Sequence, residues 1–231
     1  MTSRSVWAVV PVKPFDLAKR RLMPVLSSDE RALLARLMLE DVLDVLVACT
    51  GLSGIIVITR DEAAGRIARV NGARVLDDPD CDLNAAVRTA IEFLSAHRDA
   101  GMLVVPSDIP LLPSRLVQEM ANRISRPGTV ALVPATRDGG TNLLACNPVD
   151  TIGPSFGPDS FQRHLRAARD AGITPDVIRS AEAGLDIDRS EDLLALLSRQ
   201  SPTRSQASLA TLDIEARLQP IPQPAMSRTI S

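Results

Sequence analysis

Residues 6–22 read VWAVVPVKPFDLAKRRL and pass directly from an apolar run to a cluster of cations. The run 6–12 is apolar throughout, which is typical of a strand that is covered on both faces of a sheet. Lys13 follows at once, three more cations stand at 19–21, and the segment contains no glycine. Such a segment indicates either a loop that holds phosphate groups through lysine and arginine side chains or a solvated basic turn.

The rest of the chain repeats the apolar run and alternates it with helical patterns. Further strands are predicted over residues 54–60, 72–78, 101–108 and 129–135. Helices are predicted over residues 27–49, 61–72, 83–98, 113–125, 159–172 and 190–200. This alternation predicts an α/β fold with a mostly parallel sheet, right-handed crossovers and helices on both faces. Ligands of such sheets bind beyond the carboxyl ends of the strands, so we expect functional residues just after strands.

The character of the sequence changes near residue 200. Residues 1–200 carry the periodic strands and helices, and we expect them to form one domain. Residues 201–231 are rich in Ser, Thr and Gln and contain four prolines, which predicts a flexible tail outside the domain. An arm that docks, for example in an oligomer, is the alternative, and the sequence leaves the oligomeric state open.

The composition limits the class of protein. The chain has 231 residues, 45% of them hydrophobic, and a net charge of −2, which argues against a general binder of nucleic acid. One Trp and four Phe are too few to form stacking platforms for single strands. Three widely spaced Cys and two His predict neither a disulfide framework nor a zinc site. No apolar run is long enough to span a membrane, and we expect a cytoplasmic protein.

Carboxylates follow apolar runs at two places. Asp108 ends the stretch VVPSD, where a carboxylate is well placed to bind Mg²⁺, but taken alone the residue is better explained as a cap of the following turn. In GLDIDRSEDL (184–193), Ser190 is expected to cap the final helix, which leaves Asp186 and Asp188 unexplained by capping. We expect only one of these two aspartates to face a given metal ion.

Glycines and polar residues mark three further loops. DGGTNLLAC places Thr141 and Asn142 at the head of an apolar strand, where a hairpin turn explains the glycines but not Asn142. SFGPDSF has Gly157 in a turn and Ser160 at a helix start, which suits either an anion or an ordinary cap. The segment DLNAAV, residues 82–87, opens a helix and by itself indicates little.

Six of these stretches occur in the order expected of one family. They are VPVKPFDLAKRRL, DLNAAV, VPSDIPLL, GGTNLL, SFGPDSF and LDIDRSEDL. On them the chain resembles the phospholactate or phosphoenolpyruvate guanylyltransferases of deazaflavin coenzyme (F-420) biosynthesis, from about Val6 to Leu197. That resemblance implies a single Rossmann-like nucleotidyltransferase domain of the glycosyltransferase-A-like kind.

The resemblance also implies a reaction, in which GMP passes from GTP to the phosphate of a phosphorylated three-carbon acid and pyrophosphate is released. The catalytic residues that it implies are Lys13, Lys19 and Asp108. The implied residues for the GTP phosphates are Lys13, Lys19 and Arg21, and those for the nucleoside are Asn84 and Ala85. Mg²⁺ would be bound by Asp108 and Asp188, with Asp186 as a helper. The acceptor would be bound by Thr141, Gly157 and Ser160. Because a phosphate nucleophile is already ionised, no strong general base is needed, and catalysis rests on positioning and charge neutralisation.

The acceptor is not specified by these motifs. Phosphoenolpyruvate is favoured, with 3-phospho-D-glycerate close behind and 2-phospho-L-lactate as a third alternative. The product is unstable in the family by resemblance, so the next enzyme of the pathway is a candidate partner.

Three rival functions remain. A molybdopterin or sugar-phosphate nucleotidyltransferase would generally open with a Gly-rich loop, which this chain lacks. A nicotinamide-dependent dehydrogenase would carry G-x-G-x-x-G after its first strand, and that pattern is also missing. A non-catalytic nucleotide-binding module would have no use for both Asp108 and Asp188.

Overall fold

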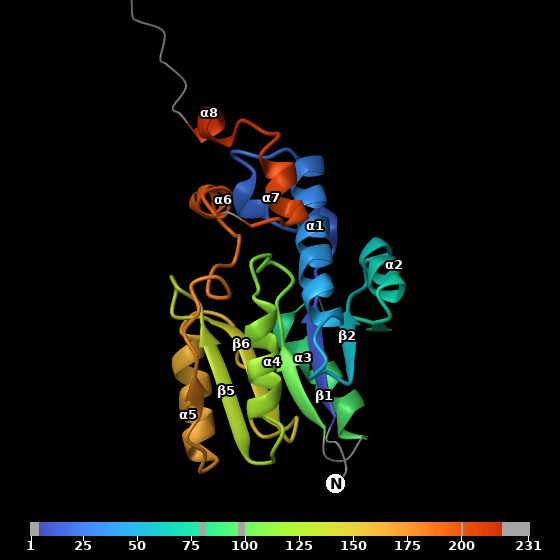
Figure 1. The fold of residues 1–231 in the computed structure, drawn as a ribbon, viewed down its shortest axis with the longest axis vertical. Helices are drawn as coiled ribbons and strands as arrows, with labels where there is room; N and C mark the ends of the chain where they lie inside the picture. Colours follow the sequence, from blue (N-terminus) through green and yellow to red (C-terminus); the bar gives the residue numbers. More distant parts are fainter. Residues whose placement is uncertain (1–4, 79–81, 97–99, 200, 219–231) are drawn as a thin grey trace, which may run out of the picture.

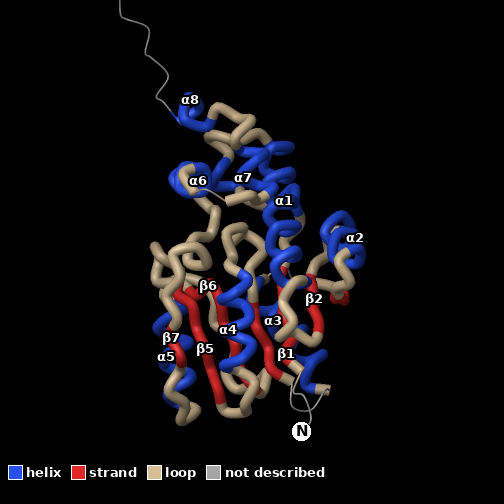
Figure 2. The backbone as a smooth tube through the Cα atoms, viewed as in Figure 1, coloured by secondary structure: helices blue, strands red, loops and turns tan. Residues whose placement is uncertain are grey.

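The computed structural model describes residues 5–78, 82–96, 100–199 and 201–218. They form a seven-stranded sheet in the order β3-β2-β1-β4-β6-β5-β7, drawn in Figures 1 and 2. The strands are β1 (Val6–Pro11), β2 (Gly54–Ile58), β3 (Arg74–Leu76), β4 (Gly101–Val104), β5 (Thr129–Pro134), β6 (Thr141–Asn147) and β7 (Asp176–Val177). β1, β2, β3 and β4 pair in parallel, which confirms the expected mostly parallel sheet.

β6, β5 and β7 complete the sheet beyond β4. β6 is antiparallel to both β4 and β5, because a short connection of residues 135–140 lets the chain turn back beside β5. β7 has two residues, too few for any alternation of apolar and polar positions to be visible in the sequence. The antiparallel β6 brings its first residues to the edge at which the parallel strands end.

Helices cover both faces of the sheet. They are α1 (Ser28–Val47), α2 (Glu62–Val70), α3 (Leu83–Ser95), α4 (Ser114–Arg123), α5 (Ser160–Asp170), α6 (Ser190–Leu197), α7 (Arg204–Leu209) and α8 (Ile214–Leu218). α1, α2 and α4 pack on one face and α3 and α5 on the other (Figure 1). The predicted cap of α1 is present, since Ser27 and Glu30 form a reciprocal capping box. No helix within the described ranges is both long and apolar enough to cross a membrane.

A third group of apolar side chains packs beyond the carboxyl edge of the sheet, where α6, α7 and α8 gather around the first turns of α1 (Figure 1). It joins distant parts of the chain. Its buried members are Leu22, Val25, Leu26, Leu34, Met38, Leu111, Leu185, Ile187, Leu193, Leu196, Leu209 and Ile214. This terminal cluster therefore holds residues 19–22 close to residues 185–188.

Residues 201–218 do not form the flexible tail that we expected. α7 and α8 pack on α1 and α6, and Leu209 and Ile214 are buried in the terminal cluster. The carboxylate of Asp41, buried in α1, accepts hydrogen bonds from the backbone N–H groups of Arg204 and Ser205 and from the Ser205 hydroxyl. Helices this short have too little periodicity to be recognised in a polar sequence. Residues 219–231, the rest of the expected tail, lie outside the described residues.

Candidate active site

A pocket of about 430 Å³ opens at the carboxyl ends of β1 and β4. Residues 11–13 follow β1 into its wall, and residues 106–108 follow β4. The strand order reverses here, because β2 and β3 lie on one side of β1 and β4 lies on the other. Ligands of open α/β sheets bind at such a reversal, and the volume lies in the range of about 300–1,000 Å³ that is usual for ligand sites.

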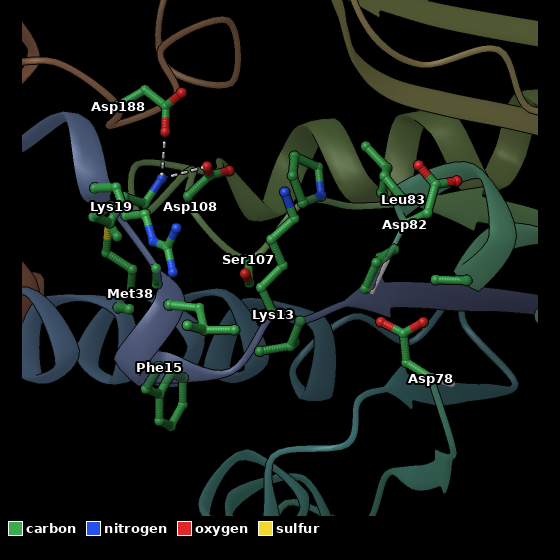
Figure 3. A pocket seen from close by; sticks show the side chains of 18 of the residues that line it. Lys13, Phe15, Lys19, Met38, Asp78, Asp82, Leu83, Ser107, Asp108 and Asp188 are labelled. Carbon is green, nitrogen blue, oxygen red and sulfur yellow. Dashed lines mark hydrogen bonds and ion pairs between the residues drawn. The ribbon is translucent and has the colours of Figure 1, made fainter. Parts of the chain in front are cut away.

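The side chain of Lys19 lies between two carboxylates in this pocket (Figure 3). Its Nζ is 2.6 Å from Oδ2 of Asp108 and 3.0 Å from Oδ1 of Asp188. The Lys19 side chain is only 7% exposed. Burial lowers the pKa of Lys19, but the two carboxylates outweigh burial and raise that pKa above its ordinary value. The ammonium group therefore stays charged and forms ion pairs with both aspartates.

Local packing fixes the backbone that carries Lys19. The residue stands between two short 3₁₀ turns, Phe15–Leu17 and Arg20–Leu22, with φ 54° and ψ 37°. A left-handed conformation is uncommon for a residue with a β-carbon and persists only where the surroundings impose it. Here Phe15 and Leu22 on either side are buried in the core. The terminal cluster and the sheet together thus aim the ammonium group at the carboxylates.

Asp188 reaches the pocket from the other end of the chain. Ile187 N–H donates to the backbone carbonyl of Asp108 at 3.0 Å, which ties the two aspartate segments together directly. The carboxylate of Asp192, in the first turn of α6, accepts from the N–H groups of Asp188 at 3.0 Å and Arg189 at 2.7 Å. These three hydrogen bonds hold the Asp188 backbone against the strand end that carries Asp108.

Asp186 belongs to the same electrostatic cluster. Burial, followed by the negative charge of Asp108, raises the pKa of Asp186. Burial acts in the same direction on Asp188, but nearby cations, Lys19 first, bring the pKa of Asp188 below its ordinary value. Residues two apart in an extended segment lie on the same side, so the backbone does not restrict a metal ion to one of the two aspartates. That reasoning corrects our expectation that only one of them faces a given ion.

Lys13 and Arg21 add positive charge around the carboxylates. Lys13 comes two residues after the end of β1 and points into the pocket between Asp108 and Asp82 (Figure 3). Arg21 Nη1 is 3.1 Å from Asp188 Oδ2, and the Arg21 side chain is 65% exposed. Cations on the open side of a carboxylate pair suit a polyphosphate that is bound together with a metal ion.

Thr141, Gly157 and Ser160 meet in a second cluster, beside the start of α5. Thr141 N–H donates to Ser160 Oγ at 2.9 Å, and Ser160 N–H donates to the carbonyl of Gly157 at 3.1 Å. Both the Thr141 and the Ser160 side chains are buried. Gly157 has φ 122°, which a residue with a side chain rarely adopts. Because β6 is antiparallel to β4, the cluster lies at the edge of the sheet where the pocket opens.

Asn84 and Ala85 are engaged in local hydrogen bonds. The Asn84 amide brackets Phe156, accepting from its N–H at 2.7 Å and donating to its carbonyl at 3.2 Å, so it fixes the loop before Gly157. Ala85 N–H donates to the Asp82 side chain at 2.9 Å, which caps α3. The residues of this helix start that line the pocket are Asp82, Leu83 and Ala86.

The structure thus divides the predicted residues between two places. The pocket wall includes Lys13, Lys19, Arg21, Asp108 and Asp188. Thr141, Gly157 and Ser160 form the second cluster, Asn84 contacts its loop, and Asp186 is close to the pocket carboxylates.

Sequence reasoning missed residues that act through hydrogen bonds to distant segments. Asp192, which also pairs with Arg137, reads in sequence as an ordinary first-turn acid. His164 is a single histidine in α5, a mostly polar helix, and nothing near it in sequence marks a role. Asn142 did give a signal, as a polar residue at the head of an apolar strand; its Nδ2 donates to the carbonyl of Ala183 at 2.9 Å.

The donor set at the pocket fits a divalent cation that binds with a phosphate ligand. Among the described residues, no group of three or more His, Cys, Asp or Glu side chains is arranged to hold a metal ion. Mg²⁺ commonly takes one or two carboxylates and completes its coordination with water and phosphate oxygens. Asp108 and Asp188 already converge on a single cationic atom, Nζ of Lys19, so two oxygen ligands are in place.

Comparisons with known proteins agree with this geometry. The family model described as "Guanylyl transferase CofC like" matches residues 6–228, so the match continues past residue 197, where we expected similarity to end. A phosphoenolpyruvate guanylyltransferase of Roseiflexus castenholzii is 41% identical over 87% of this chain and 92% of the relative. A 2-phospho-L-lactate guanylyltransferase of Methanothermobacter thermautotrophicus is 34% identical, over 89% of this chain and 90% of its own. A 3-phospho-D-glycerate guanylyltransferase of Phenylobacterium zucineum is also 34% identical, over 92% and 99%.

Solved structures share the fold at low sequence identity. A protein of Desulfovibrio desulfuricans that is classed with the nucleotide-diphospho-sugar transferases superposes with a TM-score of 0.75 at 20% identity, over 92% of this chain and 97% of that one. A protein of Mycobacterium tuberculosis, solved as a complex with manganese, has a TM-score of 0.55 at 15% identity, over 86% and 100%. Both likenesses concern the fold.

Proposed function

The chain belongs to the CofC-like guanylyl transferase family, and on that premise we propose that it transfers GMP from GTP to the phosphate of a phosphorylated three-carbon acid, with phosphoenolpyruvate favoured. A phosphate oxygen of the acid attacks the α-phosphorus of GTP. The bond from the α-phosphorus to the bridging oxygen breaks, and pyrophosphate leaves. The observation that carries the proposal is the partly buried carboxylate pair, Asp108 and Asp188, bridged by Lys19 beside exposed cations.

We assign the triphosphate to the side of the pocket that carries Lys13, Lys19 and Arg21. These side chains supply the positive charge that a triphosphate requires, in place of the backbone N–H groups of a Gly-rich loop. Lys13 and Lys19 are the proposed catalytic cations, because both project into the pocket and neutralise charge as pyrophosphate departs. Lys19 would exchange its carboxylate partners for phosphate oxygens when the nucleotide binds.

Asp108 and Asp188 are the proposed ligands of Mg²⁺, with Asp186 as a helper. Bound there, the ion would supply charge neutralisation at the phosphate groups that react. The contribution of the chain itself is to keep the two carboxylates convergent, through the hydrogen bond from Ile187 N–H to the Asp108 carbonyl and the bonds of Asp192. The fit of the donor set supports this assignment, and the identity of the ion is part of the proposal.

We assign the acceptor to the cluster of Thr141, Gly157 and Ser160. Hydroxyl and N–H donors suit the phosphate and carboxylate of a small acid, and they keep a second anion apart from the cations that hold the triphosphate. The first turn of α3 contributes residues to the pocket wall and also contacts the loop before Gly157 through Asn84. We therefore place Asn84 and Ala85 near the nucleoside, with Asn84 also fixing the acceptor loop. Phosphoenolpyruvate is favoured among the three acids because the most similar of the relatives described above is named for it.

Pyrophosphate release tests the proposal. Purified protein with Mg²⁺ and GTP is given phosphoenolpyruvate, 2-phospho-L-lactate or 3-phospho-D-glycerate, with a sugar phosphate as the control acceptor. We expect release with at least one acid and the highest rate with phosphoenolpyruvate. No release with any acid would contradict the proposal, and release only with the sugar phosphate would favour the rival function. Coupling to an enzyme that consumes the product guards against its instability.

A further inference from the structure

His164 is a buried histidine whose two ring nitrogens both have partners. It lies in α5 and is fully buried. Nδ1 is 2.9 Å from the hydroxyl of Thr141, and Nε2 is 3.0 Å from the backbone nitrogen of Ser155. The ring of Phe156 packs edge-on against the imidazole with centroids 5.0 Å apart. The histidine therefore connects the acceptor loop to the hydroxyl that we assign to the acceptor.

The contact with Ser155 fixes the tautomer of the ring. A backbone N–H only donates, so Nε2 must accept through its lone pair and carries no proton. A neutral imidazole then carries its proton on Nδ1 and donates to Thr141 Oγ1. Burial, with the nearby charge of Arg163, lowers the pKa of His164 to about 4, so the ring is neutral at physiological pH.

This arrangement sets the direction of the Thr141 hydroxyl. Its oxygen accepts from His164, so its own proton points elsewhere. The proton of the Ser160 hydroxyl also points elsewhere, because the Ser160 oxygen accepts a hydrogen bond from Thr141 N–H. Among the residues that the structure describes, neither hydroxyl donates to a protein acceptor. Two neighbouring O–H groups are thus both left as donors at the start of α5.

We propose that His164 is a positioning residue, which fixes the Thr141 hydroxyl as a hydrogen-bond donor to an anionic oxygen of the acceptor. The inference rests on the proposed function for the identity of the acceptor. Its physical consequence is selectivity, since a hydroxyl whose proton is directed at the ligand favours a phosphate or carboxylate oxygen over a neutral donor group. Without His164, the Thr141 hydroxyl is free to rotate and to donate within the protein.

Two substitutions of His164 separate this role from simple support of the loop. The amide nitrogen of His164→Asn can stand near Nδ1 and donate to Thr141, whereas His164→Gln reaches the position of Nε2 and can accept from Ser155. We expect His164→Gln to raise KM for the acid about tenfold, which is the scale of one hydrogen bond to a charged group, with KM for GTP unchanged. We expect His164→Asn to restore most of the loss. Equal effects of the two variants, or a rise in both KM values, would overturn the proposal.

A double-mutant cycle with Thr141→Val measures the coupling. Once the hydroxyl is absent, His164→Gln should cause no further rise in KM for the acid, because the two side chains act through one hydrogen bond. Additive effects would show that His164 supports the loop independently of Thr141, and they would overturn the proposal. Thr141→Ser, which keeps the hydroxyl, is the matched control and should keep the response to His164→Gln.

Nitrogen-15 NMR of the imidazole tests the tautomer without any turnover. The chain has two histidines, so His97→Gln leaves a single ring signal to assign. We expect the neutral tautomer with its proton on Nδ1 from pH 8 to pH 5, and a proton on Nε2 would overturn the inference. If the wild-type protein released no pyrophosphate with any acid, the proposed function would fail, while the spectrum would still decide the direction of the Thr141 hydrogen bond.

Discussion

One lysine holds the carboxylates of the candidate site together. Asp108 and Asp188 are 80 residues apart in sequence, and both place an oxygen within hydrogen-bond distance of Lys19 Nζ. In the free protein a positive charge therefore stands where the proposed function requires a metal ion beside the nucleotide. Removing that charge should destabilise the free protein and make the site depend on an added cation.

Lys19→Met tests this charge balance. Two partly buried carboxylates are left without their partner, and we expect the free energy of unfolding to fall by about 2 kcal/mol. Millimolar Mg²⁺ should restore part of the loss in the variant and change the wild type less. Urea unfolding with and without Mg²⁺ measures both effects. Arg20→Met is the control, because Arg20 forms no ion pair with any described residue. Identical Mg²⁺ responses in Lys19→Met and wild type would contradict this account.

Asp192 is predicted to position Asp188 without contacting the substrates. Asp192→Asn keeps the shape of the side chain but weakens the bonds to the N–H groups of Asp188 and Arg189. We expect kcat to fall about tenfold with KM for GTP nearly unchanged, since one charge-assisted hydrogen bond is of that order. Steady-state kinetics measure the split. The neighbouring Glu191→Gln, on an exposed side chain, should behave as wild type; a normal kcat in Asp192→Asn would contradict the assignment.

The sequence allowed part of this site to be predicted at the level of residues. Asp186 and Asp188 stood out because helix capping left them unexplained, whereas Asp108 gained its predicted role only from the series of six stretches taken together. The bridge by Lys19 was not predictable, because it joins positions 89 and 169 residues apart. His164 and Asp192 escaped notice for the same reason, as their partners are brought to them only by the packing of α5 and α6.

At the level of elements, α7 is attached to α1 by one buried carboxylate. Asp41 receives three hydrogen bonds from Arg204 and Ser205, which satisfy the first N–H groups of α7. Asp41→Ala would leave those donors without a partner. We expect it to lower the free energy of unfolding by about 2–3 kcal/mol, measured by urea denaturation.

Asp44 offers a matched control one turn along α1. It pairs with the Arg204 side chain at the surface, and its own side chain is 51% exposed. Exposed ion pairs contribute little, so Asp44→Ala should cost less than about 1 kcal/mol. Equal losses of unfolding free energy in the two variants would contradict the claim that Asp41 holds α7 against α1.

The elements differed in how far the sequence revealed them. Strands β1, β2 and β4 were predictable because long apolar runs identify strands buried on both faces. The antiparallel direction of β6 depends on pairing with β4 and β5, which no single run of residues encodes. α7 and α8 were missed because each is too short for a helical period, and their burial arises from contacts with the terminal cluster.

On the scale of the whole molecule, the loop that follows β1 and the segment after residue 184 meet over the carboxyl edge of the sheet. Residues 19–22 and 185–188 are held together by the terminal cluster, and α7 and α8 pack behind them. The parallel strands supply Lys13 and Asp108, and the helical end supplies Asp188. The C-terminal helices therefore pack on the same cluster that holds the pocket residues together.

Stability should fall at moderately acid pH because of His164. The pKa of His164 is lowered from 6.5 to about 4 by burial and by Arg163 in the folded chain. Between these values the unfolded chain binds a proton that the folded chain does not, so the free energy of unfolding decreases as the pH falls through this window. The decrease attributable to the ring is about 3 kcal/mol. Urea unfolding from pH 7 to pH 4 measures it, and His164→Asn should show a shallower dependence; parallel curves would contradict this prediction.

The formation of a new diphosphate tests the central claim most directly. Phosphorus-31 NMR follows the protein with Mg²⁺, GTP and phosphoenolpyruvate, and it distinguishes transfer of GMP from hydrolysis of GTP. We predict a pair of coupled phosphorus signals that join GMP to the acid, together with pyrophosphate, and the loss of both in Asp108→Asn at unchanged folding. Intact GTP, or cleavage of GTP at the same rate with and without the acid, would contradict the account.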